Sequence, residues 1–329
     1  NIVYKDKPWY PKLDVFDPQF SYCDEDMKLL KSWGFNAIRL GVMWPGVEPE
    51  YNKYNTTYID ILHKIVKDSE KYGIYVILDF HQDLLARQFC GEGVPDWVFT
   101  KPLGFPLPIS LPYKKNSMGV SSRKDCDKHN WISYHFSFGA SHGFQLLYTD
   151  LSTKFADFWR LVASRFKDSK NIIGYEIINE PWAGDIYFFP SLLWPTFADY
   201  HNLQPFYDKI ARNIFDIDDN HLILFQSVTW SIFRTGFTHT PGNRENKTIL
   251  SYHGYYPPNF SARQIFNSRN WDMKRLKCGG ILTEFSVGSG TISHETEIYH
   301  ALNLINHADR NMQSWFIWEY KKFIPITGS

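Results

Sequence analysis

Residues 172–182 (IIGYEIINEPW) constrain the fold more than any other part of the chain. They form a short apolar run with β-branched residues that ends in the polar pair Asn179 and Glu180, followed by Pro181. Such a run indicates a buried strand, and a proline ends its hydrogen-bond ladder. The pattern therefore predicts a strand that carries a carboxylate at its C-terminal tip, where barrel enzymes place their catalytic groups.

A second run has the same form. Residues 279–285 (GGILTEF) lead through apolar and β-branched residues to Glu284. Retaining glycosidases use two carboxyl groups about 5–5.5 Å apart, one protonated to assist the leaving oxygen and one ionised to attack the anomeric carbon. A single glutamate at a strand tip could equally be the structural partner of an arginine. Glu180 and Glu284 together favour a glycosidase pair.

The motif Asn179-Glu180-Pro181, followed by the strand-end Glu284, resembles the family 5 glycoside hydrolases of the large retaining clan. The longer string YEIINEPWAGD resembles the endoglycoceramidase branch of that family, and so do HQD, GVPDW and the terminal WEYK. The resemblance covers most of the chain. It implies an α/β fold of the (β/α)8 TIM-barrel type, with Glu180 as acid/base and Glu284 as nucleophile.

The resemblance also implies a set of supporting residues. Arg39 would keep the nucleophile ionised, because a nearby cation lowers the pKa of a carboxyl group. Asn179 would donate to the sugar 2-hydroxyl, and Trp318 would form the floor on which the sugar stacks. Each residue alone could be a satisfied polar residue of the core, and their coincidence at successive strand ends is what favours a site. The other expected contacts to the two glutamates or to the sugar are His253, Tyr255, His81, Asp83 and Lys5, with Lys7 as an alternative to Lys5 and Lys321 as a further lysine.

Apolar runs and helical periodicities alternate along most of the chain, which predicts right-handed βαβ units and a closed parallel barrel. The first residues resemble the tail of a barrel's first strand whose start is missing. The expected strands are 36–40, 74–80, the run opening at 172, 221–225, 249–252, 279–285 and 314–318. The expected helices are 21–33, 57–72, 150–166, 204–216 and 294–308.

A chain of 329 residues suits a single catalytic domain, 1–329, and the C-terminal β-sandwich of the bacterial relatives is expected to be absent. Two long loops, at about 84–149 and 183–203, interrupt the barrel. Prolines argue against helix in the first loop, and its aromatic residues argue against disorder. The aromatic segments 131–138 and 186–195 could form walls for two ceramide alkyl chains or a cluster that packs the loops.

Composition excludes several classes of protein. The formal net charge is zero, which gives no field for attracting nucleic acid, and no apolar stretch is long enough to span a bilayer. The four cysteines form no CxxC pair, so we expect no zinc site, and no cofactor is implied. Cys90 and Cys126 could form a disulfide across the first long loop. Together with the sequons at Asn55, Asn246 and Asn259, this favours a secreted or lumenal glycoprotein.

The expected function is cleavage of the β-glycosidic bond between the oligosaccharide and the ceramide of a glycosphingolipid, with an activator protein or a detergent-like lipid as a further partner. One alternative is a family 5 β-glucosidase or endoglucanase that acts on glucosylceramide or a soluble β-glucan. A catalytically silent carbohydrate- or lipid-binding barrel is disfavoured by the presence of both glutamates.

Overall fold

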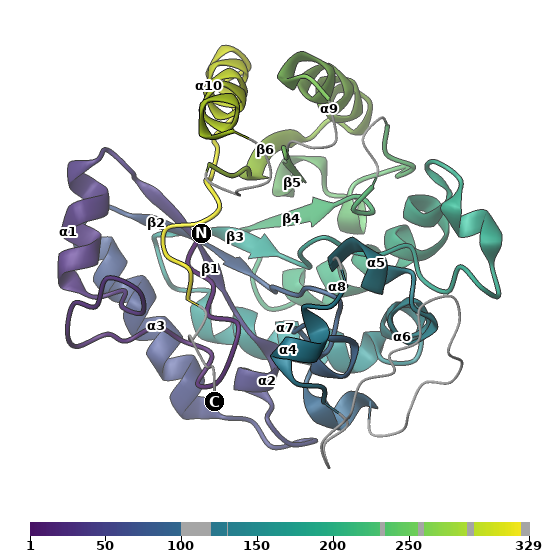
Figure 1. The fold of residues 1–329 in the computed structure, drawn as a ribbon, viewed down its shortest axis with the longest axis horizontal. Helices are drawn as coiled ribbons and strands as arrows, with labels where there is room; N and C mark the ends of the chain where they lie inside the picture. The colour runs from purple at the N-terminus through teal and green to yellow at the C-terminus, as the bar shows by residue number, and fades with distance from the viewer. Residues whose placement is uncertain (100–119, 130, 231–233, 256–259, 288–292, 324–329) are drawn as a thin grey trace.

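Six parallel strands form one sheet in their order along the chain. The computed structural model describes residues 1–99, 120–129, 131–230, 234–255, 260–287 and 293–323, and helices surround the strands (Figure 1). All the strands expected between residues 36 and 285 are present, so the parallel βα architecture is confirmed. The strands are β1 Ala37–Gly41, β2 Tyr75–Asp79, β3 Ile172–Glu176, β4 Leu222–Gln226, β5 Thr248–His253 and β6 Gly279–Glu284.

Two short segments fill the gap between β1 and β6. Ile2 forms a parallel bridge with Leu40 on β1, while Trp315 and Trp318 form parallel bridges next to β6. The Asn1 side chain joins the two segments, because its Nδ2 donates to the carbonyls of Thr283 (3.1 Å) and Ile317 (3.0 Å). The strand expected at 314–318 is therefore present only as isolated bridges, and with residues 1–3 it completes a (β/α)8 barrel.

An apolar cluster lies among the strands, separate from the larger core beneath the helices. Ala37 lies two residues before Arg39 on β1, and Ile77 lies two residues before Asp79 on β2, so each pair shares one face of its strand. The cluster therefore fills the barrel just below the polar strand ends, as interleaved residues of alternate strands do in such barrels. Its members are Ile77, Leu224, Ile281 and Phe316, with Ala37, Ile173 and Ile249 packed against them.

Helices cover the outside of the barrel. In α3, Asn55 caps the N-terminus by accepting from the Tyr58 N–H. The apolar residues of the helix, among them Leu62 and Ile65, are buried, and this apolar face is what packs the helix onto the barrel. The expected helices are confirmed to within a few residues. The covering helices are α1 Asp24–Ser32, α2 Trp44–Val47, α3 Thr56–Lys71, α7 Ser152–Phe166, α8 Gln204–Phe215, α9 Ala262–Leu276 and α10 His294–Arg310.

Helix α9 was not expected from the sequence. It lies beside α10 next to β5 and β6 (Figure 1), and it begins with a capping box in which Ser261 and Gln264 bond each other's backbone N–H groups. The S-x-x-Q pattern is a helix-start signal that was present in the chain.

The first long loop contradicts one expectation. Its second half is helical, because the prolines that argue against helix lie before residue 113, and those from Pro102 to Pro112 fall outside the described residues. Cys90 and Cys126 form a disulfide that ties the two parts of the loop together. The loop contains the short helices η1 Arg87–Phe89 and η2 Asp96–Phe99 and the α-helices α4 Arg123–Cys126, α5 Trp131–His135 and α6 Phe138–Tyr148.

Two further connections contain short helical turns. The second long loop contains η3 Pro190–Leu193 and η4 Asp199–Leu203, and the connection before β5 contains η5 Pro241–Asn243 and η6 Glu245–Lys247. No helix in the described part of the chain has the length and apolarity needed to cross a bilayer.

Candidate active site

The two predicted catalytic glutamates lie at the C-terminal end of the barrel. Glu284 is the last residue of β6. β3 ends earlier than expected, at Glu176, but the chain continues along its neighbours, because Ile177 N donates to Leu224 O (3.1 Å). Glu180 itself has φ +39°, and its N–H donates to Gln226 Oε1 (2.7 Å). A side-chain acceptor from β4 thus supports the strained backbone that carries Glu180.

The structure brings Glu180 and Glu284 together across His253. The His253 Nδ1 lies 2.7 Å from Glu180 Oε1 and 3.5 Å from Glu284 Oε2, and one oxygen of each glutamate lies within 4.8 Å of the other. Inverting glycosidases separate their carboxyl groups by about 6.5–9.5 Å to admit a water, whereas retaining enzymes need about 5–5.5 Å. The spacing here fits the retaining arrangement.

Glu284 is held in the ionised form. Its Oε1 accepts from Arg39 (2.6 Å) and its Oε2 accepts from the Tyr255 hydroxyl (2.6 Å). Burial opposes ionisation, but the charges of His253 and Arg39 outweigh it and lower the pKa of Glu284 below its ordinary value. The carboxylate is therefore available to attack at neutral pH.

Arg39 is the centre of a buried network. The side chain is completely buried, and beyond Glu284 its guanidinium bonds Glu176 Oε2 (2.5 Å) and Asn179 Oδ1 (2.8 Å) and lies 3.0 Å from Asp79 Oδ1. A buried cation needs such partners. The partners Glu176 and Asp79 were missed by sequence reasoning, although both lie within predicted strands; in the structure each is the last residue of its strand. The sequence did hold a signal for these partners: a charged Arg39 within an apolar, buried strand requires anionic groups on the neighbouring strands.

A second group of charged residues flanks the glutamates at the β2 side. His81 stacks on Trp318, with ring centroids 5.0 Å apart and planes at 11°, and its Nδ1 lies 2.9 Å from Asp79 Oδ2. Burial opposes the protonation of His81, but hydrogen bonds to Asp79 and Asp83 raise its pKa to about 9. Lys5 forms an ion pair with Asp83, and its Nζ lies 4.8 Å from the Trp318 ring centroid. Four expected residues, Lys5, His81, Asp83 and Trp318, therefore form one cluster.

Two further residues at this end were not predicted. Gln82 donates from Nε2 to the carbonyls of Asn179 (2.6 Å) and Glu180 (2.9 Å), so it fixes the backbone that carries the acid/base candidate. Glu92 lies 3.1 Å from Lys5 Nζ through its Oε1. Gln82 is the middle residue of HQD, so its position was visible in the sequence, whereas Glu92 had no pattern to mark it.

The two other candidate lysines do not join this cluster. Lys321 is buried in an ion pair with Asp26, and its Nζ also donates to Asp17 O (2.8 Å) and Ser21 Oγ (3.0 Å), in the connection before α1. Lys7 is exposed. A sugar contact by Lys321 would require breaking these bonds, so the geometry favours Lys5.

The aromatic segments of the two long loops lie against each other. Phe138 packs on Tyr187 and Phe188, with ring centroids 5.6 and 6.1 Å away, and the Tyr187 hydroxyl donates to Phe136 O. Phe136 also contacts Trp182, two residues after Glu180, at 5.0 Å. The side chains of Phe188 and Trp194 are 65% and 71% exposed. Part of the aromatic cluster therefore packs the two loops against each other, as expected for a structural cluster. The other part faces solvent, as a wall for ceramide alkyl chains would require.

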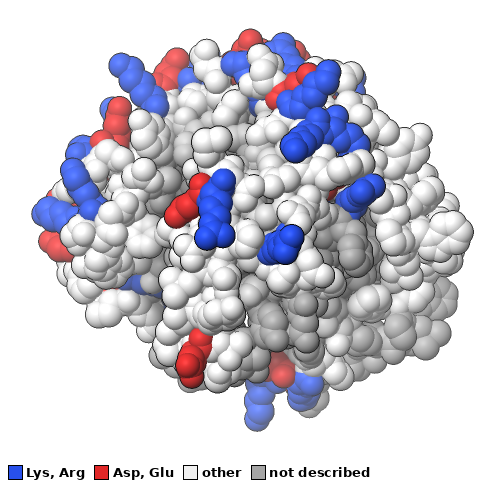
Figure 2. Space-filling view, turned by 90° about the horizontal axis from the view of Figure 1, so that it is seen from above, with Lys and Arg blue, Asp and Glu red and all other residues white. Residues whose placement is uncertain are grey.

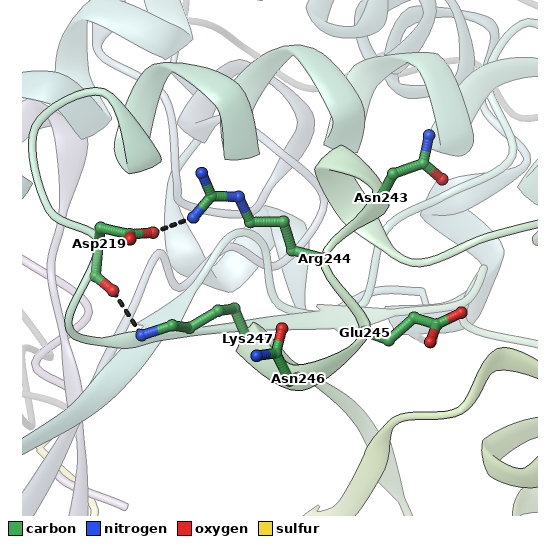
Figure 3. Close-up of a pocket in the computed structure, with 6 residues that line it drawn as sticks. All are labelled: Asp219, Asn243, Arg244, Glu245, Asn246 and Lys247. Carbon is green, nitrogen blue, oxygen red and sulfur yellow. Dashed lines mark hydrogen bonds and ion pairs between the residues drawn. The ribbon is translucent and has the colours of Figure 1, made fainter.

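A cavity lies elsewhere in the described part of the protein. It encloses about 440 Å³ at the opposite end of the barrel, beside the starts of β4 and β5, and Arg244 and Lys247 both reach Asp219 across it (Figure 3). The face shown in Figure 2 mixes positive and negative side chains with wide uncharged areas. This open cavity holds the Arg244–Asp219 ion pair and no pair of neighbouring carboxyl groups, so the strand-end cluster is the better candidate site.

Comparisons with known proteins bear on the family and the fold. The family model described as cellulase (glycosyl hydrolase family 5) matches residues 15–323. The endoglycoceramidase of Hydra vulgaris is 41% identical over 98% of the chain, and that of Cyanea nozakii is 43% identical over 98%. The chain spans 63% and 65% of the length of these two relatives. The structure of endo-glycoceramidase II from Rhodococcus sp. aligns with 97% of this chain and with 75% of its own length. The TM-score is 0.74 at 18% sequence identity, which supports the barrel fold.

Proposed function

Because the chain belongs to glycosyl hydrolase family 5, we propose that it is a retaining glycosidase that cleaves the β-glycosidic bond between the oligosaccharide and the ceramide of glycosphingolipids. The observation that carries the proposal is the placement of Glu180 and Glu284 on either side of His253, with oxygens within 4.8 Å. The 41–43% identity to two endoglycoceramidases supports the substrate class.

The reaction proceeds in two steps in this proposal. Glu284, kept ionised by Arg39 and Tyr255, attacks the anomeric carbon and forms a covalent glycosyl-enzyme while Glu180 gives its proton to the leaving ceramide oxygen. Glu180 then takes a proton from water, which hydrolyses the intermediate. His253 lies between the two carboxyls and stabilises their negative charge in turn.

The sugar binds at the polar side of the pair. Trp318 serves as the floor, Asn179 as the donor to the 2-hydroxyl, and His81, Asp83 and Lys5 as the groups that orient the sugar. The close association of His81 and Lys5 with the Trp318 ring supports this assignment. The exposed aromatic residues of 186–195 would receive the ceramide chains on the other side.

The stereochemical outcome tests this mechanism. We expect net retention, so proton NMR of the first-formed sugar from a β-linked glycolipid should show the β-anomer before mutarotation. An initial α-anomer would exclude the covalent intermediate on Glu284. Higher activity on a soluble cello-oligosaccharide than on a purified glycolipid would favour the alternative of a β-glucosidase or endoglucanase.

We also propose that the protein is secreted or lumenal. The Cys90–Cys126 disulfide supports an oxidising compartment. Asn55 and Asn246 are exposed, as N-glycosylation requires, while Asn259 lies outside the described residues. Digestion of protein from a secretory host with an N-glycosidase should shift its mass if either exposed sequon is used. A detergent-like lipid or an activator protein would serve to present the lipid substrate.

A further inference from the structure

Residues 90–93 fold back onto the chain that follows β2, beside the Trp318 floor. Asp83 and Glu92 form an antiparallel bridge in which Asp83 N donates to Glu92 O (3.0 Å) and Glu92 N donates to Asp83 O (2.8 Å). Directly opposed residues of an antiparallel pair place their side chains on the same face. The backbone therefore sets the two carboxyl groups side by side.

Two glycines permit this close approach. A Cβ on Gly91 would lie 1.7 Å from the Asp83 carbonyl oxygen, and one on Gly93, which has φ +143°, would lie 2.5 Å from the Gln82 Cβ. Cys90 anchors the same segment through its disulfide to Cys126. The backbone on both sides of Glu92 is therefore held in place, which fixes the position of its side chain.

The Lys5 ammonium lies between these two carboxyls. It forms an ion pair with Asp83, lies 3.1 Å from Glu92 Oε1 and lies 4.8 Å from the centroid of the Trp318 ring. The ligand atoms of His81, Asp83 and Glu92 lie within 4.8 Å of one another, a spacing that could also hold a metal ion. The Lys5 ammonium already supplies a positive charge between these carboxyl groups, where a metal ion would otherwise do so.

The two carboxyl groups are not equivalent. Burial and the neighbouring Asp83 raise the pKa of Glu92 to about 8 against the influence of Lys5. Burial opposes ionisation of Asp83 as well, but Lys5 and His81 outweigh it and hold the pKa of Asp83 well below its ordinary value. At neutral pH Glu92 therefore keeps a proton and Asp83 is ionised.

We propose that Glu92 is a positioning residue of the sugar site: set beside Asp83 by the backbone bridge, it fixes the Lys5 ammonium over Trp318, where Lys5 donates to a hydroxyl group of an uncharged sugar. The inference rests on the proposed function, because it takes Trp318 as the sugar floor. The charges that face Glu92 are Lys5, Asp83 and His81, with Glu319 acting through Lys5. The two cations are balanced by Asp79 and Asp83, which leaves no excess charge for an acidic sugar.

Substitution of Glu92 tests the proposal. For Glu92→Ala we expect the KM for an aryl glycoside of the preferred sugar to rise about tenfold with a much smaller change in kcat, because Lys5 loses one of its two anchors. Glu92→Gln keeps a neutral side chain of nearly the same shape, so it should recover most of this loss below pH 7. It should also remove the alkaline decline of kcat/KM that the titration of Glu92 gives the unmodified protein near pH 8. Glu50→Gln makes the same chemical change at an exposed site and serves as control.

Two results would overturn the proposal: equal losses for Glu92→Gln and Glu92→Ala in correctly folded protein, or an alkaline decline that Glu92→Gln leaves in place. A second measurement does not depend on activity. Isotope-edited infrared spectra of the whole chain should show a protonated carboxyl at pH 7 that titrates near pH 8 and is missing in Glu92→Gln. If the protein cleaves glycolipid and this signal is absent, the role of Glu92 fails alone. If the signal is present and no glycolipid is cleaved, the proposed function fails instead.

Discussion

Two regions, the polar flank beside β2 and the apolar flank in the second long loop, differ in almost every physical property. On the side of β2, Lys5, His81, Asp83 and Glu92 are largely buried and bonded to one another around Trp318. On the side of the second long loop, residues 186–195 carry no charge, and Phe188, Phe189 and Trp194 are at least half exposed. Fixed polar groups recognise a ligand by direction, whereas exposed apolar groups recognise it by covered area. The difference suits a substrate with a sugar at one end and a lipid at the other.

The centre shared by both flanks should give the largest effect. For Glu284→Gln we expect kcat to fall about 10⁴-fold or more on every substrate, because the attacking charge is lost while the shape remains. Substrate binding, measured by calorimetry, should largely survive. Glu180→Gln should affect poor leaving groups most. Near wild-type turnover of natural substrate by either variant would show that the catalytic assignment is wrong.

Truncation of the apolar flank should separate the two ends of the substrate. Replacement of Phe188, Phe189 and Trp194 together by alanine should depress kcat/KM on a detergent-dispersed glycosphingolipid far more than on an aryl glycoside with the same sugar. Five covered methylenes at about 0.8 kcal/mol each set an upper limit of roughly a thousandfold, and ordering costs reduce it. Equal losses on both substrates would identify the segment as a structural cluster.

Removal of the charge from the polar flank should have the opposite signature. For Lys5→Met we expect about a tenfold loss of kcat/KM, and the loss should be the same on the glycolipid and on the aryl glycoside because the sugar is common to both. Lys53→Met, at an exposed position, is the matched control. A loss confined to the lipid substrate would contradict the division between the flanks.

The smallest expected effect is on stability at alkaline pH. The pKa of His81 is raised from 6.5 to about 9, so its contribution to the free energy of unfolding is complete below pH 6.5 and is lost as the pH rises through 9. Each such proton changes this free energy by at most about 1.4 kcal/mol per pH unit. Urea unfolding between pH 6 and 9 should show the decline, and His81→Asn should flatten it. An unchanged slope would mean that His81 is not held as the cation.

The residues at the strand ends could be predicted because each follows an apolar run, and parallel strands end at one edge of the barrel. Glu180, Glu284, Arg39 and His253 were placed this way, and they lie together. The place of Glu92 in the site could not be predicted from the sequence. Its partner Lys5 lies far away in the chain, and only the fold-back of residues 90–93 brings the two together. The helices α5 and α6 were missed because the argument against helix, which rests on prolines in the first part of the loop, was extended to the whole loop.

Arg39 has a consequence for how the protein reaches its working state. Its partners Glu176 and Glu284 are 137 and 245 residues away in the chain, and all the groups involved are buried. Until the last strands dock, the guanidinium faces an incomplete set of anions, and a dry cavity with an uncompensated charge is costly. Distant contacts of this kind also form late, because long loops must close first. In the proposed mechanism the nucleophile Glu284 is therefore activated by the event that closes the barrel, so a chain that has collapsed but not yet closed would have no working catalytic centre.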